Sequence, residues 1–330
     1  MDLRRLRDKI YLVWLSWQIS NFHARGGKIV VITGSYGKTS VKELAYDLLR
    51  HKYRVVATSG NYNTVVGIVK TIRYEVVKDT QLLILEVGAY RVGEIAEFCR
   101  VLKPDIGVVT GIARQHLERF GSFEKIIQAK TEIAGYIHLH GGILIANGSD
   151  ETVVNEIKNA LWYRGSGREN INQNGAKMIA RVCGMSEQEI QQVAEHFRSV
   201  PSRFEMTMGR YGMRVIDDSY NSNEKSFAEA VEHLGKQKKY TRILVTPGLL
   251  ELGSESNKIH EQLGKGIIGN ADLVILVGRG ERIKSLAKGI DGKVKISYID
   301  KTLEFVQSVN NLKLKKEPLV LLENDLPENH

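Results

Sequence analysis

From Lys28 onward, hydrophobic and polar residues alternate between two periods. Short aliphatic and β-branched runs, typical of buried strands, are each followed by a segment with apolar residues at helical spacing. In the first half, the predicted strands cover residues 28–32, 53–57, 82–87, 105–110 and 142–146, and the predicted helices begin near residues 38, 93 and 122. This alternation predicts an α/β fold with parallel strands, crossover helices and a site at the carboxyl ends of the strands.

The pattern is interrupted between Asn147 and Asn174 and resumes with helices at about 176–183 and 187–197. We interpret Pro201–Arg203 as a hinge into a second domain, where the alternation returns. The predicted strands there are 214–217, 242–246, 273–277, 295–299 and 319–322, and the predicted helices are 224–234, 258–268, 281–288 and 302–309.

We therefore expect three segments. Residues 1–27 form an amphipathic helix, residues 28–200 a P-loop central domain with a parallel sheet, and residues 201–330 a Rossmann-like C-terminal α/β domain. A chain of 330 residues is long enough for two domains that each bury a core.

The N-terminal segment has the most unusual pattern. One helical stripe runs through apolar residues, and the first turns contain four basic residues: the stripe is Leu3, Leu6, Ile10, Val13 and Trp17, and the basic residues are Arg4, Arg5, Arg7 and Lys9. The apolar stretch is shorter than the about 20 residues that span a bilayer. We favour a helix packed on the nucleotide domain. The alternative is an interfacial helix that brings residues 1–20 into peripheral contact with a membrane.

Composition and charge narrow the class of protein. Charged residues at 26% and hydrophobic residues at 42% are typical of a soluble globular chain. A net charge of +9 suits anionic ligands such as nucleotides, and the basic residues are spread along the chain, so nucleic acid is not an expected partner. Cys99 and Cys183 lie in helix-like segments without metal-ligand spacing, which indicates reduced core residues in a cytoplasmic protein.

Residues 28–40 predict a phosphate site. A buried strand is followed by a tight glycine-containing loop and then, from Lys38, by a helix. The N–H groups of such a loop and the helix N-terminus converge on one point, which suits phosphate. Lys38 would reach the β- and γ-phosphates, and the Thr39 hydroxyl would hold Mg²⁺. Ile32 stands where the strict P-loop pattern has glycine, but the strand and helix still favour nucleotide binding over a simple turn.

Other polar residues follow strand ends. Glu86 ends a buried strand, where a carboxylate is costly unless it is paired or binds a metal, so we consider it a Mg²⁺ ligand. His116 follows the next strand, a position where a structural or exposed histidine is more common than a ligand. Lys130 lies inside a helix, where a surface salt bridge is the usual role. Asp217 and Asp218 are typical of a turn but could also hold a ribose or a metal.

Six short segments, in this order, resemble the motifs of the Mur ligase family. They are Thr33-Gly-Ser-Tyr-Gly-Lys-Thr-Ser40, Ser59-Gly-Asn-Tyr-Asn63, Glu86-Val-Gly-Ala89, His116-Leu-Glu-Arg-Phe-Gly-Ser122, Ala129-Lys-Thr-Glu-Ile133 and Asp217-Asp-Ser-Tyr-Asn-Ser-Asn223. One motif alone would be weak, whereas six in sequence are strong. The resemblance extends from about Lys28 into the second domain and weakens beyond Gly253. It is greatest to members that add D-alanyl-D-alanine to a UDP-linked tripeptide.

The resemblance implies an ADP-forming amide ligase of cell-wall precursor synthesis. The family phosphorylates a carboxylate with ATP and lets an amine, amino acid or dipeptide attack the acyl phosphate. By position, the phosphate-binding residues are Gly34, Ser35, Tyr36, Gly37, Lys38, Thr39 and Ser40. Thr39 and Glu86 would hold a first Mg²⁺, and His116 a second. Lys130 matches a lysine that several members carbamylate, which would turn a cation into a metal ligand (N6-carboxylysine).

The same resemblance assigns residues around the nucleotide and the amine. Arg203 would lie near the phosphates, and Asp218 would hold the ribose. Depending on a shift of one residue, the adenine would be read by Asn172, Gln173 or Asn174. The amine side would be lined by Tyr220, Asn221 and Asn223.

Besides the adenine-binding asparagine, which cannot be placed at a single position, the sequence departs from the family in three places. No UDP-sugar-binding domain precedes the phosphate loop. The segment of residues 147–170 is shorter than the corresponding segment of the family, which suggests that a small antiparallel sheet has been lost. Residues 321–327 stand where the family has a lysine-rich signature. Two alternatives stay open: a Mur-like ligase for a cofactor precursor or glutamyl chain, and a non-catalytic ATP-binding partner. Joint retention of Lys38, Glu86, His116 and Lys130 argues against the second. The oligomeric state stays open.

Overall fold

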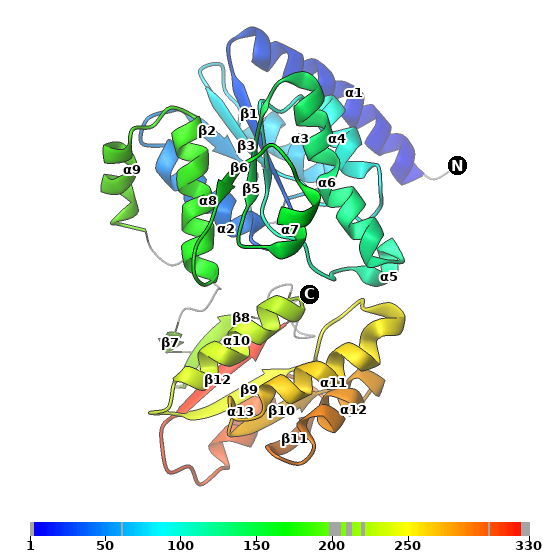
Figure 1. Ribbon diagram of the computed structural model, residues 1–330, viewed down its shortest axis with the longest axis vertical. Helices are drawn as coiled ribbons and strands as arrows, with labels where there is room; N and C mark the ends of the chain where they lie inside the picture. Colours follow the sequence, from blue (N-terminus) through cyan, green and yellow to red (C-terminus); the bar gives the residue numbers. More distant parts are fainter. Residues whose placement is uncertain are drawn as a thin grey trace. The chain divides into compact units, whose positions relative to one another are not determined.

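The computed structural model describes residues 3–60, 62–197, 206–208, 213–218, 222–302 and 304–324. The chain forms two compact units (Figure 1). Unit 1 comprises Met1–Ile112 and Ser122–Arg198, and unit 2 comprises Ala113–Gly121 and Ser199–His330. Each unit contains one six-stranded sheet. The proposed hinge at 201–203 lies outside the described residues.

The sheet of unit 1 is entirely parallel, with the strand order β2-β3-β1-β4-β5-β6. Its strands are β1 (Lys28–Thr33), β2 (Val55–Ala57), β3 (Leu82–Glu86), β4 (Ile106–Val109), β5 (Ile143–Asn147) and β6 (Leu161–Tyr163). Residues 29–33 of the central strand β1 are all buried, which explains why it reads as a continuous apolar run. The predicted parallel α/β sheet is confirmed.

Helices pack on this sheet in two groups. In unit 1 they are α1 (Leu3–Ala24), α2 (Lys38–Leu49), α3 (Val65–Tyr74), α4 (Glu94–Leu102), α6 (Phe123–His140), α7 (Glu151–Glu156), α8 (Arg168–Val182) and α9 (Glu187–Ala194). Helix α2 packs against α8, whereas α4 packs against α6 and α1 lies across α3 and α4 (Figure 1). The loop between β1 and α2 is therefore fixed between sheet and helix layer.

Helix α1 packs on unit 1, as we favoured, but through a different face. Its buried residues are Leu15, Ile19 and Phe22. The predicted stripe instead points to solvent at Ile10, Val13 and Trp17, and the side chains of the first stripe residues, Leu3 and Leu6, lie outside the described part. The prediction of the face was wrong because the run from Ile10 to Trp17 is apolar nearly all round, so periodicity alone does not select one side.

Residues 147–182 also differ from the sequence prediction. The segment forms α7 and β6, and β6 pairs with β5 in parallel. Helix α8 begins at Arg168 rather than near Ala176. Its first two turns contain polar residues without an apolar stripe, so they gave no helical signal. The three adenine-site candidates consequently lie inside a helix and not in a loop.

The sheet of unit 2 has the order β11-β10-β9-β12-β8-β7. Its strands are β7 (Met206–Met208), β8 (Arg214–Asp218), β9 (Thr241–Thr246), β10 (Leu273–Val277), β11 (Lys295–Ile299) and β12 (Pro318–Glu323). The helices are α5 (Leu117–Phe120), α10 (Glu224–Lys236), η1 (Gly253–Glu255), α11 (Ser256–Ile267), α12 (Glu281–Ile290) and α13 (Glu304–Asn310). The bounds of β10 and β11 match the prediction. Strand β7, antiparallel to β8, was missed because it has only three residues.

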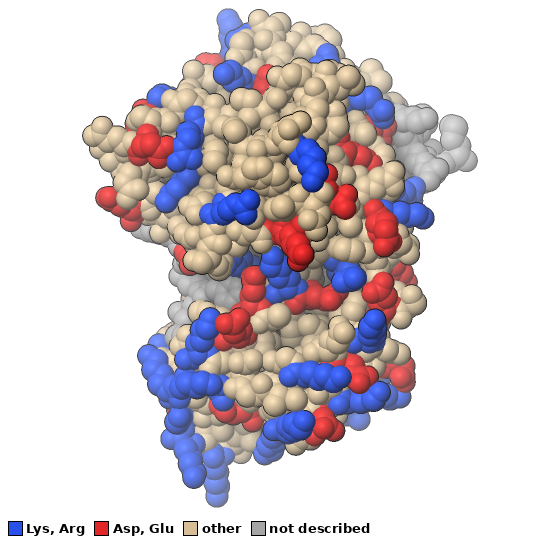
Figure 2. All heavy atoms as spheres, in the orientation of Figure 1, with Lys and Arg blue, Asp and Glu red and all other residues tan. Residues whose placement is uncertain are grey.

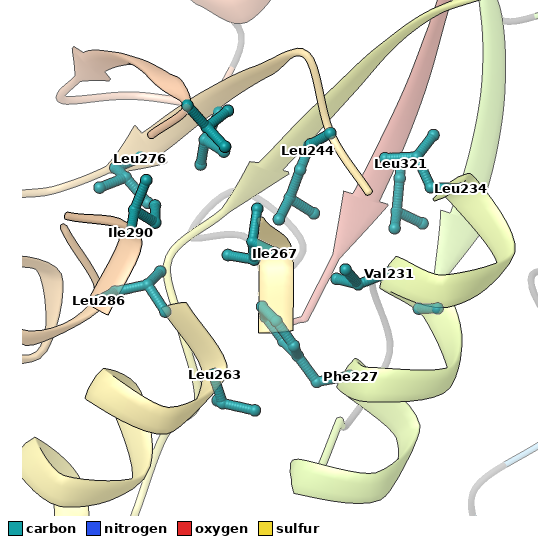
Figure 3. Packing of buried hydrophobic residues seen from close by; sticks show 14 of the residues in the cluster. Phe227, Val231, Leu234, Leu244, Leu263, Ile267, Leu276, Leu286, Ile290 and Leu321 are labelled. Atoms are coloured by element: carbon teal, nitrogen blue, oxygen red, sulfur yellow. The ribbon is translucent and has the colours of Figure 1, made fainter. Parts of the chain in front are cut away.

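One core of unit 2 lies between its sheet and helices α10, α11 and α12 (Figure 3). Leu244, Leu276 and Leu321 point from the strands toward Phe227 and Ile267 on the helices. The carboxyl ends of the five parallel strands β8–β12 therefore lie at the same edge of a well-packed sheet.

Helices α11 and α12 cross at two glycines. A β-carbon on Gly264 would lie 2.9 Å from the Gly289 Cα atom, and a β-carbon on Gly289 would lie 3.0 Å from the Gly264 Cα atom. The two backbones therefore approach more closely than side chains would permit.

Two surface features bear on partners. Basic and acidic side chains are interspersed over the face of unit 1 that Figure 2 shows. Within the described residues, no helix combines the length and the apolar character needed to cross a bilayer.

Candidate active site

The loop between β1 and α2 is held against the end of β4. The Thr110 hydroxyl donates to the Tyr36 carbonyl oxygen at 2.5 Å, and Ser35 N–H donates to the Gly111 carbonyl oxygen at 2.6 Å. Gly34 has φ 145°, and a β-carbon there would lie 2.9 Å from the Gly111 oxygen, so the position requires glycine. Gly37, with φ 81°, turns the chain directly into α2. The N–H groups in the first turn of α2 therefore lie directly after the loop, and such groups at a helix N-terminus bind anions.

Side chains of this loop are also anchored. The Tyr36 hydroxyl donates to Asp150, a buried carboxylate that also accepts from Ile112 N–H at 3.3 Å. Lys38 Nζ donates to the Ser35 carbonyl oxygen at 3.1 Å, which folds the lysine back over the loop. Thr39 follows in the first turn of α2 and is half-buried. The loop is therefore a preformed cradle with a lysine and a hydroxyl at its rim.

Glu86 lies beside this cradle. It is the last residue of β3, is paired in register with Ile32 of β1, and is 1% exposed. Its Oε1 atom accepts from Asn63 Nδ2 at 3.4 Å. Its Oε2 atom has no hydrogen-bond partner among the described residues and lies 3.9 Å from Lys42 Nζ. A buried carboxylate oxygen left in this state is suited to a cation.

Lys42 is a site residue that the sequence analysis missed. It is fully buried in α2, and its ammonium donates to the carbonyl oxygens of Thr58 at 2.5 Å and Gly60 at 2.6 Å. It also lies 3.0 Å from Glu43 Oε1. The available signal was its spacing, because a residue four positions after Lys38 lies on the same side of the helix. Lys42 connects α2 to the turn after β2 and to Glu86.

Lys130 is buried, so the surface salt bridge expected from its position was wrong. It lies on the inner side of α6 and donates to the Ala89 carbonyl oxygen at 3.3 Å. Burial, followed by the positive charge of Lys38, lowers the pKa of Lys130 to about 7, although nearby acids including Glu86 act in the opposite direction. Lys38, Glu86 and Lys130 are thus within electrostatic range of one another.

The three adenine-site candidates have different surroundings. Asn172 is buried, and its Oδ1 atom lies 3.0 Å from the position of a β-carbon on Gly37. Gln173 Nε2 donates to Glu169 at 3.4 Å, and Asn174 Nδ2 donates to the Arg164 carbonyl oxygen at 2.7 Å. Asn172 is therefore the candidate beside the phosphate loop, while the two others make contacts at the start of α8.

His116 belongs to unit 2, where its Nδ1 atom pairs with Glu251. Arg119 donates twice to Glu251 Oε1, at 3.0 and 2.7 Å. Burial alone would raise the pKa of Glu251, but the hydrogen bonds and charges of His116 and Arg119 lower it overall. His116 is therefore held by a carboxylate through one ring nitrogen. Its proposed metal role remains a prediction.

The remaining candidates of unit 2 lie at or after the end of β8. Asp218 is buried, and its carbonyl oxygen accepts from Asn324 N–H at 3.2 Å. Asn223 caps α10 by accepting from Lys225 N–H and Ser226 N–H, both at 3.1 Å. Arg203, Tyr220 and Asn221 lie outside the described residues.

The residues near the cradle fit a phosphate-bound Mg²⁺. Within the part of the chain that the structure describes, no group of three or more His, Cys, Asp or Glu side chains could hold a metal. Mg²⁺ at a phosphate site does not need such a group, because one or two protein oxygens suffice beside water and phosphate. The Thr39 hydroxyl and Glu86 Oε2 supply oxygens of this kind.

Two family models match almost the entire chain. The model of the Mur ligase middle domain matches residues 32–202, and the model of the Mur ligase glutamate ligase domain matches residues 202–323.

Individual proteins are also similar to this chain over most of its length. The UDP-N-acetylmuramoyl-tripeptide–D-alanyl-D-alanine ligase of Escherichia coli (strain K12) is 28% identical over 307 residues, covering 80% of this chain and 67% of that protein. The enzyme of the same name from Bacillus subtilis (strain 168) is 25% identical over 322 residues, covering 86% of this chain and 70% of that protein.

Solved structures share the fold. A crystal structure of MurF from Acinetobacter baumannii has a TM-score of 0.84 at 22% identity, covering 98% of this chain and 78% of that one. The structure of MurF from Thermotoga maritima in complex with ADP has a TM-score of 0.81 at 24% identity, covering 96% and 80%.

Proposed function

The chain belongs to the Mur ligase family, and on that premise we propose that it is an ATP-dependent, ADP-forming ligase that joins a carboxylate to an amine. The observation that carries the proposal is the preformed cradle of residues 34–37 with Lys38, Glu86 and Lys130 in electrostatic range of one another. A protein that only bound a nucleotide would not need a lysine of lowered pKa buried near the phosphates.

The chemistry consists of two displacements. In the first, the substrate carboxylate attacks the γ-phosphorus of ATP and ADP leaves, which forms an acyl phosphate. In the second, the amine attacks the acyl carbon, the amide forms, a proton is lost from nitrogen and inorganic phosphate leaves. Lys38 and the N–H groups of the loop and α2 hold the transferring phosphoryl group and stabilise its charge. Bound Mg²⁺, held by Thr39 and Glu86, would neutralise phosphate charge.

Lys130 is proposed to carry a carbamate. A pKa of about 7 leaves roughly half of the amine neutral at neutral pH, and the neutral form is the nucleophile that attacks CO₂. The positive charge of nearby Lys38 would then stabilise the resulting anion. The modified side chain would place carboxylate oxygens, which can bind a metal, beside the phosphates instead of a second ammonium group.

We propose a cell-wall precursor as the substrate. Relatives from Escherichia coli and Bacillus subtilis are named as ligases of D-alanyl-D-alanine to a UDP-N-acetylmuramoyl tripeptide. The carboxylate would then be the end of a muramoyl peptide and the amine that of a D-alanyl-D-alanine dipeptide. Asn172, beside the phosphate loop, is the side chain we assign to the nucleotide.

ADP release tests this proposal. The purified chain, with Mg²⁺ and ATP, should release ADP only when UDP-N-acetylmuramoyl tripeptide and D-alanyl-D-alanine are both present, and mass spectrometry should show the joined product. Omission of either substrate is the matched control. ADP release without the amine would contradict amide formation. Release with a glutamyl acceptor, but not with the muramoyl peptide, would overturn the assigned substrate while leaving the ligase chemistry intact.

A further inference from the structure

Helix α1 lies on the outside of unit 1, against α3 and α4 (Figure 1), and it carries exposed apolar side chains. Ile10, Val13 and Trp17 are 60%, 73% and 62% exposed, and their spacing places them on one side of the helix. Exposed Arg7 precedes this line and exposed Ser20 continues it. We call Ile10, Val13 and Trp17 the outer stripe.

The outer stripe cannot be buried by rotation of α1. The opposite side inserts Leu15, Ile19 and Phe22 into unit 1. The end of the helix is fixed because His23 Nε2 lies 3.1 Å from the Lys103 carbonyl oxygen and Arg25 Nη1 donates to the Lys78 carbonyl oxygen at 3.3 Å. Turning the stripe inward would expose three core side chains. The folded chain therefore presents this face to whatever surrounds it.

We propose that α1 docks the protein on the surface of a membrane that contains anionic lipids. Charge and composition identify the partner. Residues 1–9 contain four basic and two acidic residues, a net charge of +2 (4 − 2), and residues 10–22 contain no charged residue. An apolar face with a tryptophan, next to a basic end, matches an interfacial helix that inserts its apolar side chains beside negatively charged headgroups. The helix would lie in the plane of the interface and not cross it.

A second copy of the chain fits this face less well. A stable protein interface buries about 800 Å² on each partner, with about 20–30 residues a side. The outer stripe offers three large apolar side chains. Membrane binding needs only a few inserted side chains when electrostatic attraction adds to them, and it is weak and reversible. The expected contact is therefore salt-sensitive.

Vesicle flotation tests the proposal with the full chain. Vesicles of phosphatidylcholine mixed with phosphatidylglycerol in equal parts should float the protein at low salt, and vesicles of phosphatidylcholine alone should not. The variant Ile10→Ser/Val13→Ser/Trp17→Ser should reduce the partition coefficient by roughly tenfold or more. Because the three side chains are exposed, its thermal unfolding midpoint should equal that of the wild type, which shows that the variant is folded.

A matched control removes the same number of exposed apolar residues elsewhere. The variant Leu139→Ser/Leu161→Ser/Tyr298→Ser changes side chains that are 81%, 45% and 49% exposed, and should float like the wild type. Failure of the wild type to float on anionic vesicles would overturn the proposal, as would equal flotation of the outer-stripe variant. A dimer in light scattering that this variant abolishes would identify a second copy as the partner instead. The assay needs no ligase activity, so its outcome is independent of the proposed function.

Discussion

The ammonium of Lys42 lies 3.9 Å from Glu86 Oε2, and both side chains are buried in unit 1. The ammonium also donates to the Thr58 and Gly60 carbonyl oxygens and lies 3.0 Å from Glu43 Oε1. A buried pair of this kind contributes little net stability, but either charge alone is costly. Lys42 thus permits a carboxylate to be placed beside the phosphate loop.

We expect Lys42→Met to lower the free energy of unfolding of unit 1 by about 3–5 kcal/mol, because Glu86 would be left buried without its cation. Tryptophan fluorescence during urea unfolding can measure this, since Trp14, Trp17 and Trp162 all lie in unit 1. The double variant Lys42→Met/Glu86→Gln should recover much of the loss. If Lys42→Met were as stable as the wild type, the burial of Glu86 would not depend on the Lys42 ammonium.

Lys38→Ala should reduce ADP release by about 10²–10³-fold or more, since the lysine charge acts on the transferring phosphoryl group. The fold should be retained, because Lys38 is only half-buried and donates to the Ser35 carbonyl oxygen of its own loop. The control is Lys125→Ala, which removes an exposed lysine of unit 1. Phosphate release equal to that of the wild type would refute the assignment.

Lys130→Ala should abolish turnover, and added bicarbonate should not restore it. A short carboxylate such as acetate should restore part of the activity, because it can occupy the space of the missing carbamate. Lys125→Ala, a change in the same helix, should remain active and keep its response to bicarbonate. A wild-type protein whose mass and activity are unchanged by removal of CO₂ would show that Lys130 acts as an amine.

Lys130 should also make stability depend on pH in CO₂-free buffer. The pKa is lowered from 10.5 to about 7 in the folded chain, chiefly by burial. Between these values the unfolded chain binds more protons than the folded chain, so the free energy of unfolding should rise as pH increases from about 7. Lys130→Met should lose this rise, as measured by urea unfolding across the window. If the free energy of unfolding of the wild type and of Lys130→Met changed with pH in the same way, Lys130 would not be a neutral buried amine.

The sheets and the phosphate loop could be predicted because their signals are local. A strand such as β10 is an uninterrupted apolar run with turns at both ends, and its bounds were found without error. The loop of residues 34–37 has glycines where the backbone needs positive φ. Each feature depends on residues that are adjacent in the sequence.

The burial of Lys42 and Lys130 could not be predicted because the groups that their ammonium ions contact are distant in the sequence. Lys42 depends on carbonyl oxygens 16 and 18 residues away, and Lys130 on one that is 41 residues away. Neither lysine differs in sequence from a surface lysine on a helix. The face of α1 was missed for a related reason, since α3 and α4, which are distant in the sequence, pack against that helix.

The close crossing of α11 and α12 should determine which substitutions a mutational library tolerates at the two glycines. Random substitutions selected only for soluble expression should retain glycine at positions 264 and 289, where an added methyl group meets the opposite backbone. Gly266, two residues along the same helix, should accept many residues, because a β-carbon there has no atom within 4 Å. The ratio of tolerated residues at these positions would report, from sequencing counts alone, how closely two helices approach.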